Sequence, residues 1–269
     1  MKLITSPDNR IVKEAASLSE KKYRERYGAF MVEGYKLTEE AVKQNGTVKC
    51  IFIRSSASQR SQELAKEAEE LGVDVFETTG DVFSKIVSTE TPQDIVSVLE
   101  LPRTDGAAFT EKTAGGDILV LDRLQDPGNV GTLIRTAEAM GFSGILAVKG
   151  TADPYQPKVV RAAAGSILRM PVMICEDAAA ALDLIAEAGR RPFAAAAGQG
   201  SVDCSEADIS GDSALIIGNE GSGVSKELLD ASVCIKIPME GRTESLNAAV
   251  AGSILMYESN RQKGLKNKR

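Results

Sequence analysis

The chain has 269 residues, 43% hydrophobic and 26% charged, a composition typical of a soluble globular protein with one large domain or two ordinary ones. It contains no histidine, which excludes Ser-His-Asp and Cys-His catalysis and histidine-based metal sites. Four scattered cysteines, the lack of an apolar run of about 20 residues and the lack of an apolar N-terminal segment predict a cytoplasmic protein with no metal site and no membrane span.

The net charge of −6 is unevenly distributed along the chain. Residues 1–60 carry 12 Lys and Arg against 7 acidic residues, and the tail after Asn260 holds five basic residues and no acid. Basic ends on an acidic chain favour binding to a polyanion. A solvated helix face and a frayed tail would give the same pattern.

The first third of the chain alternates between helix and strand patterns. A basic segment at 6–28 resembles a helical arm, and the apolar spacing predicts helices over 32–44 and 61–72 and strands over 48–54, 73–77 and 94–101. These elements predict a small α/β domain over residues 1–105, with the basic arm at its start.

Residues 106–116 are predicted to form a linker, because the stretch "PRTDGAAFTEKTAGGD" around them is rich in Gly, Pro, Thr and Ala and has no apolar period. An ordinary surface loop within a single domain is the alternative.

Residues 117–269 are predicted to form a second domain in which strands and helices alternate. The strand at 117–122 is almost continuously apolar, which is typical of a parallel sheet buried on both faces. The pattern predicts an open, mostly parallel sheet flanked by helices. Its remaining elements are helices over 128–141, 157–170, 177–189 and 225–231, a last helix from Ser245, and strands over 144–148, 171–175, 192–197, 213–218 and 233–237.

Three loops at the ends of these strands carry polar residues, and ligands of such sheets bind at the carboxyl ends of the strands. Asn129 begins a helix that contains Arg135, which could also be a cap followed by an exposed arginine. Glu220 lies in a Gly-rich loop whose spacing matches neither a P-loop nor a Rossmann fingerprint. Ser245 and Asn247 follow an Ile-Pro-Met segment, where small polar residues would ordinarily cap the helix.

Together these loops resemble a known family. N-x-G-x-x-x-R-x-A (129–137), G-N-E-G-x-G (218–223) and I-P-M-x-G-x-x-x-S-L-N (237–247) resemble the three signature motifs of the SpoU (TrmH) family of RNA 2′-O-ribose methyltransferases. The first third is similar to the family's L30e/L7Ae-like substrate-binding domain, most clearly in "YGAFMVEGYKLTEEAV". The resemblance implies that the parallel sheet forms a SPOUT-type trefoil knot.

The resemblance also implies that S-adenosylmethionine is the cofactor and that no metal is needed, since the cofactor carries the methyl group. The residues that it places around the cofactor are Gly218, Ile237, Leu246, Ala196, Ala197, Gly198, Asn219, Gly221 and Met239.

The family's arginine corresponds to Arg135, which we expect to stabilise the developing alkoxide of the ribose rather than act as a base, because arginine stays protonated. The remaining polar site residues, expected to position Arg135, the 2′-hydroxyl and the methionine moiety, are Asn129, Glu220, Ser245 and Asn247.

Family members act as homodimers with the last helix at the interface. RNA is expected on the basic arm and on a patch near Lys158, the candidate residues being Lys21, Lys22, Arg24, Arg26, Arg161 and Ser166. The first domain resembles that of members acting on ribosomal RNA, which favours rRNA as the substrate. A tRNA methyltransferase, a base-nitrogen methyltransferase and a non-catalytic RNA-binding or ribosome-assembly factor are the alternatives.

Overall fold

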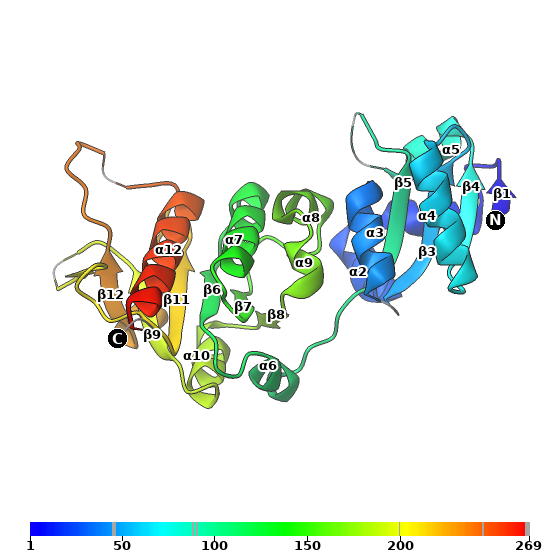
Figure 1. The fold of residues 1–269 in the computed structure, drawn as a ribbon. Coiled ribbons are helices and arrows are strands. Elements are labelled where there is room, and N and C mark those ends of the chain that lie inside the picture. The colour runs from blue at the N-terminus through cyan, green and yellow to red at the C-terminus, as the bar shows by residue number, and fades with distance from the viewer. Residues whose placement is uncertain (45–46, 88, 90, 199, 244, 267–269) are drawn as a thin grey trace. The chain divides into compact units, whose positions relative to one another are not determined.

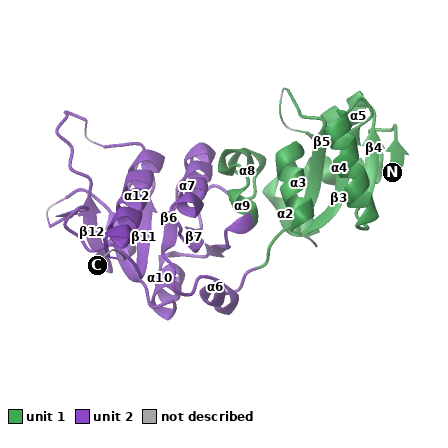
Figure 2. Ribbon diagram, in the orientation of Figure 1, with its two compact units in different colours: residues 1–103, 155–168 green, residues 104–154, 169–269 purple. Residues whose placement is uncertain are grey.

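The protein is described here by a computed structural model, which covers residues 1–44, 47–87, 89, 91–198, 200–243 and 245–266 (Figure 1). The basic tail residues Lys268 and Arg269 therefore lie outside the described residues. The chain forms two compact units (Figure 2). The first unit comprises Met1–Arg103 and Tyr155–Leu168, and the second comprises Thr104–Pro154 and Arg169–Arg269.

The first unit is built on a five-stranded mixed sheet in the order β1-β4-β3-β5-β2. Side chains alternate across it: Phe52 belongs to an apolar cluster with residues of α1 and α5, whereas Ile51 and Ile53 belong to a second cluster with residues of α3 and α4. The strands are β1 (Lys2–Ile4), β2 (Ala29–Glu33), β3 (Val48–Arg54), β4 (Asp74–Thr78) and β5 (Ile95–Glu100). The helices are α1 (Arg10–Ser17), α2 (Lys21–Tyr27), α3 (Tyr35–Lys43), α4 (Gln59–Glu70) and α5 (Gly80–Ile86).

The predicted α/β character of this unit is confirmed, with several corrections. The helix predicted over 32–44 begins only at Tyr35, because Ala29–Glu33 is strand β2, paired with β5. The basic arm is two helices rather than one, separated at Leu18–Glu20. Strand β1 and helix α5 were not predicted.

The segment predicted as one helix over 157–170 is broken. It forms α8 (Pro157–Ala163) and the short α9 (Ser166–Arg169), because Ala164 and Gly165 both have positive φ. Most of this segment groups with the first unit, where the ring of Tyr155 packs against Phe30 at a centroid distance of 5.0 Å. The sequence pattern had assigned it wholly to the second domain.

The second unit contains a seven-stranded sheet in the order β10-β12-β9-β11-β6-β7-β8, with every pair parallel, as predicted. Its strands are β6 (Ile118–Asp122), β7 (Gly144–Val148), β8 (Val172–Cys175), β9 (Arg191–Ala195), β10 (Val202–Asp203), β11 (Ser213–Gly218) and β12 (Val233–Lys236). Its further helices are α6 (Gly106–Lys112), α7 (Pro127–Ala139), α10 (Ala178–Glu187), α11 (Lys226–Asp230) and α12 (Ala248–Lys266).

Helices cover both faces of this sheet. Residues of α6, α10 and α11 form one core cluster with alternate residues of β6, β7 and β11. Helices α7 and α12 pack together on the other face, where Gly252 lets α12 approach the side chains of Leu133 and Ile217. An added Cβ at Gly252 would lie only 2.4 Å from Leu133 Cδ2.

The segment predicted as a linker is instead partly helical. Asp105 caps α6 by accepting a hydrogen bond from the backbone N–H of Ala108, and Phe109 is fully buried in the core of the second unit. One aromatic side chain among Ala and Thr gave no apolar period, although its burial packs α6 against the core.

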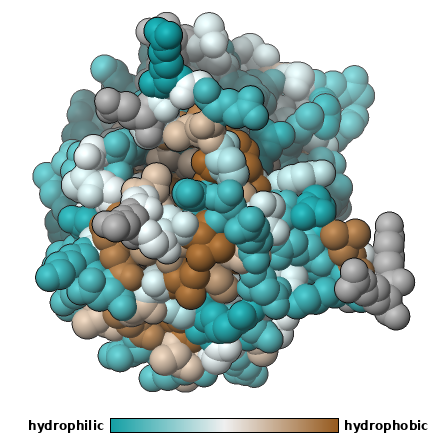
Figure 3. All heavy atoms as spheres, turned by 90° about the vertical axis from the view of Figure 1, so that its left-hand side faces the viewer, coloured by the Kyte–Doolittle hydropathy of each residue, from teal (hydrophilic) through white to brown (hydrophobic). Residues whose placement is uncertain are grey.

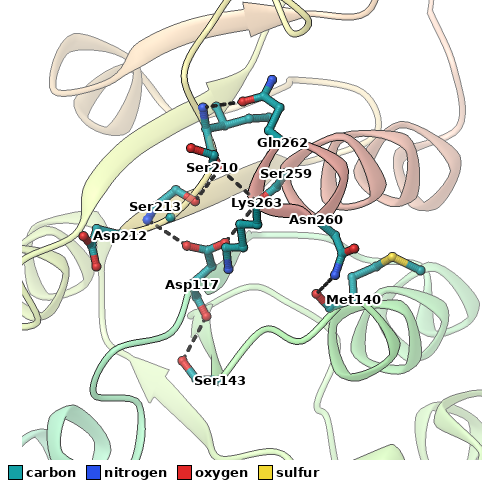
Figure 4. Close-up of polar contacts among 12 residues, drawn as sticks. Asp117, Met140, Ser143, Ser210, Asp212, Ser213, Ser259, Asn260, Gln262 and Lys263 are labelled. Carbon is teal, nitrogen blue, oxygen red and sulfur yellow. Dashed lines mark hydrogen bonds and ion pairs between the residues drawn. The ribbon is translucent and has the colours of Figure 1, made fainter. Parts of the chain in front are cut away.

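A buried polar network fixes the distal part of α12 (Figure 4). Asp117 precedes β6 and is fully buried. Its carboxylate accepts hydrogen bonds from the backbone N–H of Ser213 and from Ser259 Oγ, and both donor–acceptor distances are 3.0 Å. Lys263 Nζ forms an ion pair with the same carboxylate at a distance of 2.6 Å. Asn260 adds a bond to the carbonyl of Met140 after α7. These contacts join α12 to β6, β11 and α7, at the end of the sheet opposite the predicted site.

Candidate active site

A cavity of about 520 Å³ lies at the carboxyl ends of β9, β11 and β12. Residues from the three loops after these strands line it, so the predicted convergence of the second and third motifs is present. Of the residues predicted around a cofactor, Gly198 alone is not in the lining; those present are Ala196, Ala197, Gly218, Asn219, Gly221, Ile237, Met239 and Leu246. Glu220, Ser245 and Asn247 line the same cavity.

The loop after β11 folds back tightly onto its own strand. A Cβ added to Gly218 would lie 2.2 Å from the backbone N of Val224, so only glycine fits there. Asn219 and Gly223 exchange two backbone hydrogen bonds of 3.1 and 2.9 Å. The side-chain oxygen of Asn219 accepts from the N–H groups of Gly221 and Ser222, and its nitrogen donates to the carbonyl of Arg123. The side chain of Asn219 therefore shapes the loop.

The carboxylate of Glu220 organises the neighbouring loop before α7. It accepts hydrogen bonds from the backbone N–H groups of Gln125 and Asp126, both 3.2 Å, and from Asn129 Nδ2 at 2.9 Å. Burial alone would raise the pKa of this carboxyl, but the bonds from Asn129 and the backbone hold it below its ordinary value. Glu220 is thus an ionised acceptor at the rim of the cavity, and its hydrogen bonds join the first motif to the second.

Asn129 extends this connection to the third motif. Its side-chain oxygen accepts a hydrogen bond of 3.0 Å from Asn247 Nδ2, and Asn247 in turn caps α12 by accepting from the N–H groups of Ala249 and Val250. Since α12 begins at Ala248, the prediction of a helix from Ser245 was wrong. The capping interpretation holds for Asn247, while Ser245 lies three residues before the helix and lines the cavity.

Arg135 is not brought into this cluster. It lies two turns along α7 from Asn129, is exposed, and does not line the cavity. Across the described ranges its guanidinium has no hydrogen bond or ion pair with another side chain. The arginine is therefore available to a group from outside this part of the chain.

A second hollow of about 530 Å³ runs along α7 and α12, and Asn129 and Asn247 line it as well. Its α12 wall contains the exposed apolar side chains of Val250, Ile254 and Tyr257. The face of the molecule on the side of β12 and α12 shows apolar patches between hydrophilic side chains (Figure 3). Asn247 lines both the hollow and the cavity, so it lies between them.

The basic residues predicted to contact RNA divide into two groups. Lys21, Lys22 and Arg26 of α2 are exposed, as are Lys158 and Arg161 of α8. Arg24 is wrong as an RNA contact, because its guanidinium is buried and donates to the carbonyls of Leu18 and Ser19. Ser166 is likewise wrong as a direct contact, because only 2% of it is exposed.

The sequence reasoning missed Asp122, at the end of β6. Its fully buried carboxylate accepts from the N–H of Ser225 at 2.6 Å and from Arg123 Nε at 2.9 Å, which ties the segment after the Gly-rich loop to the end of β6. The available signal was an acidic residue that ends an otherwise apolar strand. Further lining residues that were not assigned a role are Ala195, Ile217, Gly223, Ile235, Lys236, Ala248, Ala251 and Leu255.

The described residues also limit the chemistry of the site. Among them, no three His, Cys, Asp or Glu side chains are grouped so as to hold a metal ion. All four cysteines are free thiols, and burial raises the pKa of Cys50 to about 12 and of Cys175 to about 11. No helix within the described ranges is long and apolar enough to span a bilayer.

Comparison with known proteins identifies the two parts of the chain. Residues 117–257 match the SpoU rRNA Methylase family, and residues 9–97 match the MRM3-like substrate binding domain. The 23S rRNA (guanosine(2553)-2′-O)-methyltransferase RlmP of Bacillus subtilis is 37% identical over 96% of this chain and 98% of its own length. The 23S rRNA (uridine(2479)-2′-O)-methyltransferase of Streptomyces viridochromogenes is 30% identical over 97% of this chain and 92% of its own.

Solved structures agree in fold over almost the whole chain. The AdoMet-bound rRNA methyltransferase of Sinorhizobium meliloti is 33% identical, with a TM-score of 0.86 over 97% of both chains. The SpoU methyltransferase AviRb of Streptomyces viridochromogenes is 26% identical, with a TM-score of 0.85 over 96% of this chain and 99% of that one. With the three motifs assembled at one sheet edge, these likenesses give a single conclusion: the chain belongs to the SpoU rRNA methylase family.

Proposed function

We propose that this protein transfers a methyl group from S-adenosylmethionine to a ribose 2′-hydroxyl of ribosomal RNA. The observation that carries the proposal is the hydrogen-bonded chain Glu220–Asn129–Asn247, which joins one residue from each of three motifs beside a cavity. Two relatives that are similar over almost the whole chain are rRNA 2′-O-methyltransferases by name.

The cavity fits S-adenosylmethionine in size and chemistry. Its volume of about 520 Å³ lies within the range of small-molecule sites. Ile237, Leu246 and the alanines after β9 offer an apolar slot for the adenine, next to the ends of strands whose backbone groups can accept and donate. The ionised carboxylate of Glu220 at the rim contributes negative potential near a cofactor that carries cationic sulfonium and ammonium groups.

When bound, the cofactor supplies an electrophilic methyl group. The protein must then hold the 2′-oxygen in line with it and stabilise the charge that develops as the hydroxyl loses its proton. Asn129, Ser245 and Asn247 position the ribose and the methionine moiety, and Glu220 holds Asn129. Arg135 remains protonated and offsets the negative charge on the 2′-oxygen, together with a nearby RNA phosphate.

A second copy of the chain completes this arrangement. The exposed apolar side chains of Val250, Ile254 and Tyr257 on α12, beside the hollow along α7, suit a homodimer face. Membership of the SpoU rRNA methylase family supports a trefoil knot in the second unit. The four free thiols suit a reducing compartment and, with an rRNA substrate, support a cytoplasmic location.

Large-subunit rRNA is the first substrate to test, because both named relatives act on 23S rRNA. One modifies a guanosine and the other a uridine, so family membership leaves the nucleotide to be determined by experiment. The position named for the 37% identical relative is the first candidate.

The test uses purified protein, tritiated S-adenosylmethionine and unmodified RNA in three separate reactions: large-subunit rRNA, small-subunit rRNA and tRNA. Methylation of large-subunit rRNA at one ribose, mapped by resistance to alkaline cleavage, is the expected result. Label in tRNA alone would show that the substrate is tRNA rather than rRNA. Cofactor binding by calorimetry, without methyl transfer to any of the three RNAs, would overturn the proposal.

A further inference from the structure

The first unit contains a cavity of about 230 Å³ between α1, α2 and the sheet. We call it the tyrosine pocket; the lining residues used below are Ile11, Glu14, Leu18, Tyr27, Lys49 and Cys50. Its walls are mainly apolar, and polar groups reach it from Glu14, Lys49 and Tyr27. It is smaller than the sites that hold drug-sized molecules, so it suits a single ring system.

Positive charge gathers at this pocket. Lys49 Nζ donates to the carbonyl of Tyr27 over 3.1 Å, the guanidinium of Arg26 lies 5.6 Å from the Tyr27 ring centroid, and Arg103 Nη2 lies beside Gly28. In the described part of the chain, none of these three cations pairs with a carboxylate. The other lysines near them differ, because Lys13, Lys21 and Lys22 each pair with a neighbouring acid.

An aromatic surface leads away from the pocket along α2. The rings of Tyr23 and Tyr27 stack with centroids 6.1 Å apart and planes 13° apart. Lys22 Nζ lies 4.7 Å from the Tyr23 ring centroid, so each tyrosine has a cation beside it. Apolar slots, tyrosine rings and unpaired cations together are the means by which proteins hold unstacked RNA bases and their phosphates.

We propose that the tyrosine pocket binds one unpaired nucleobase of the RNA substrate, with its phosphates on Lys49, Arg26 and Arg103. The base enters between Ile11, Leu18 and the ring of Tyr27. Oε1 of Glu14 already accepts from Arg10 Nε over a distance of 2.8 Å, so its second oxygen, Oε2, accepts the hydrogen bond from an exocyclic amino group, which favours guanine, adenine or cytosine over uracil. The inference rests on the proposed RNA methyltransferase function for the identity of the ligand, although the site itself lies wholly within the first unit.

Occupancy is tested directly on the full chain by methyl NMR, without methyl transfer. The four nucleoside 5′-monophosphates are titrated into protein labelled at Ile, Leu and Val methyls, followed by a single-stranded RNA hexamer and a duplex of the same composition. Shifts at Ile11 and Leu18 with the single strand, and weaker ones with uridine monophosphate, are expected. Shifts confined to the second unit, or equal responses to strand and duplex, would overturn the proposal.

Two matched pairs of variants then test affinity for the rRNA substrate. Lys49→Glu should raise the Kd for RNA at least tenfold, whereas Lys66→Glu on α4, with the same change in net charge, should raise it less than threefold. Ile11→Glu should act like Lys49→Glu, and Leu71→Glu, also an exposed apolar residue, should act like Lys66→Glu. Equal losses within either pair would refute a specific pocket.

The two proposals can fail separately. If the protein methylates rRNA and the monophosphates leave Ile11 and Leu18 unshifted, the tyrosine pocket is refuted while the enzyme function stands. If the pocket binds nucleotides and no RNA is methylated, the proposed function fails. The affinity of each variant for S-adenosylmethionine, measured by calorimetry, should stay within twofold of the unsubstituted protein.

Discussion

Asn247 Nδ2 donates a hydrogen bond to Asn129 Oδ1 over 3.0 Å, and this single contact joins the start of α12 to the first turn of α7. Asn129 uses its other side-chain atom to reach Glu220. Because one amide serves two partners from different segments, its removal should loosen both walls of the active site rather than one.

Asn129→Ala should therefore weaken S-adenosylmethionine binding about tenfold, the loss expected for one to two net hydrogen bonds. Calorimetry on the purified protein measures this, and methyl transfer should fall further because the ribose is also misplaced. Thr132→Ala, on the same helix and exposed, is the matched control and should leave cofactor affinity within twofold. Equal affinities for the two variants would contradict the linking role of Asn129.

The pKa of Glu220 should lie below 4.5 and should rise when Asn129 is replaced. Burial raises this pKa, but the hydrogen bonds from Asn129 and the backbone together lower it by more than burial raises it. The carboxylate therefore stays ionised in the folded protein. A lowered folded-state pKa stabilises the fold above the unfolded value, and that contribution disappears as the pH falls through the folded value. The carboxylate is exposed, so the contribution is under about 1 kcal/mol.

The measurement is a pH titration of ¹³C-labelled glutamate carboxyl groups by NMR, with Glu220 assigned from Glu220→Gln. A midpoint at or above 4.5 in the unsubstituted protein, or one that Asn129→Ala leaves in place, would show that the hydrogen bonds do not control its charge.

Gly218→Ala should destabilise the second unit by about 2–4 kcal/mol, because the new Cβ would lie 2.2 Å from backbone that cannot move without opening the loop. Gly221→Ala in the same loop is the control, since its Cβ would meet nothing nearer than Asn219 Oδ1 at 3.6 Å. Urea unfolding followed by circular dichroism compares the two. Similar midpoints would mean that the loop does not need to pack against Gly218.

The sequence was informative where periodicity and local turns decide structure. The continuous apolar strand at 117–122 predicted a buried parallel strand, and β6 is buried at every position and pairs with a strand on each side. The motifs predicted that Glu220 and Asn247 would meet, and both line the same cavity. These features depend on short segments and on the rule that parallel strands end at one edge.

Other features depend on partners far along the chain and could not be predicted in this way. Phe109 anchors α6, in an Ala- and Thr-rich stretch, by packing its ring among core residues that come from distant parts of the chain. Arg24 looks like its basic neighbours in sequence, yet it closes the turn between α1 and α2 by binding two carbonyls. The Asp117–Lys263 contact spans most of the second unit, and no local pattern indicates it.

That contact gives a further prediction for stability. Asp117→Asn should lower the free energy of unfolding by about 2 kcal/mol, because the buried amide keeps one acceptor oxygen where the carboxylate offers two oxygens to its three donors. It also removes the charge that pairs with Lys263, which is itself partly exposed. Asp208→Asn breaks the solvent-exposed pair with Lys266 and should change stability by less than about 0.5 kcal/mol. Urea unfolding at constant pH compares the two variants. Equal losses of stability would contradict the role of the Asp117 network in holding α12.

Arg135→Ala should abolish methyl transfer, with at least a hundredfold loss in turnover, while the affinity for S-adenosylmethionine stays within twofold. The reason is that Arg135 lies outside the cavity that fits the cofactor and has no partner among the described residues, so its charge acts only on bound RNA. Single-turnover methylation of rRNA and calorimetry with the cofactor measure the two quantities.

Arg135→Lys retains the charge and should recover part of the rate if the role is electrostatic. If instead Arg135 acted as a base, the rate of the unsubstituted enzyme would rise with pH and that of the Lys variant would rise at lower pH, since lysine loses its proton more readily. Unchanged turnover in Arg135→Ala would remove this residue from the mechanism altogether.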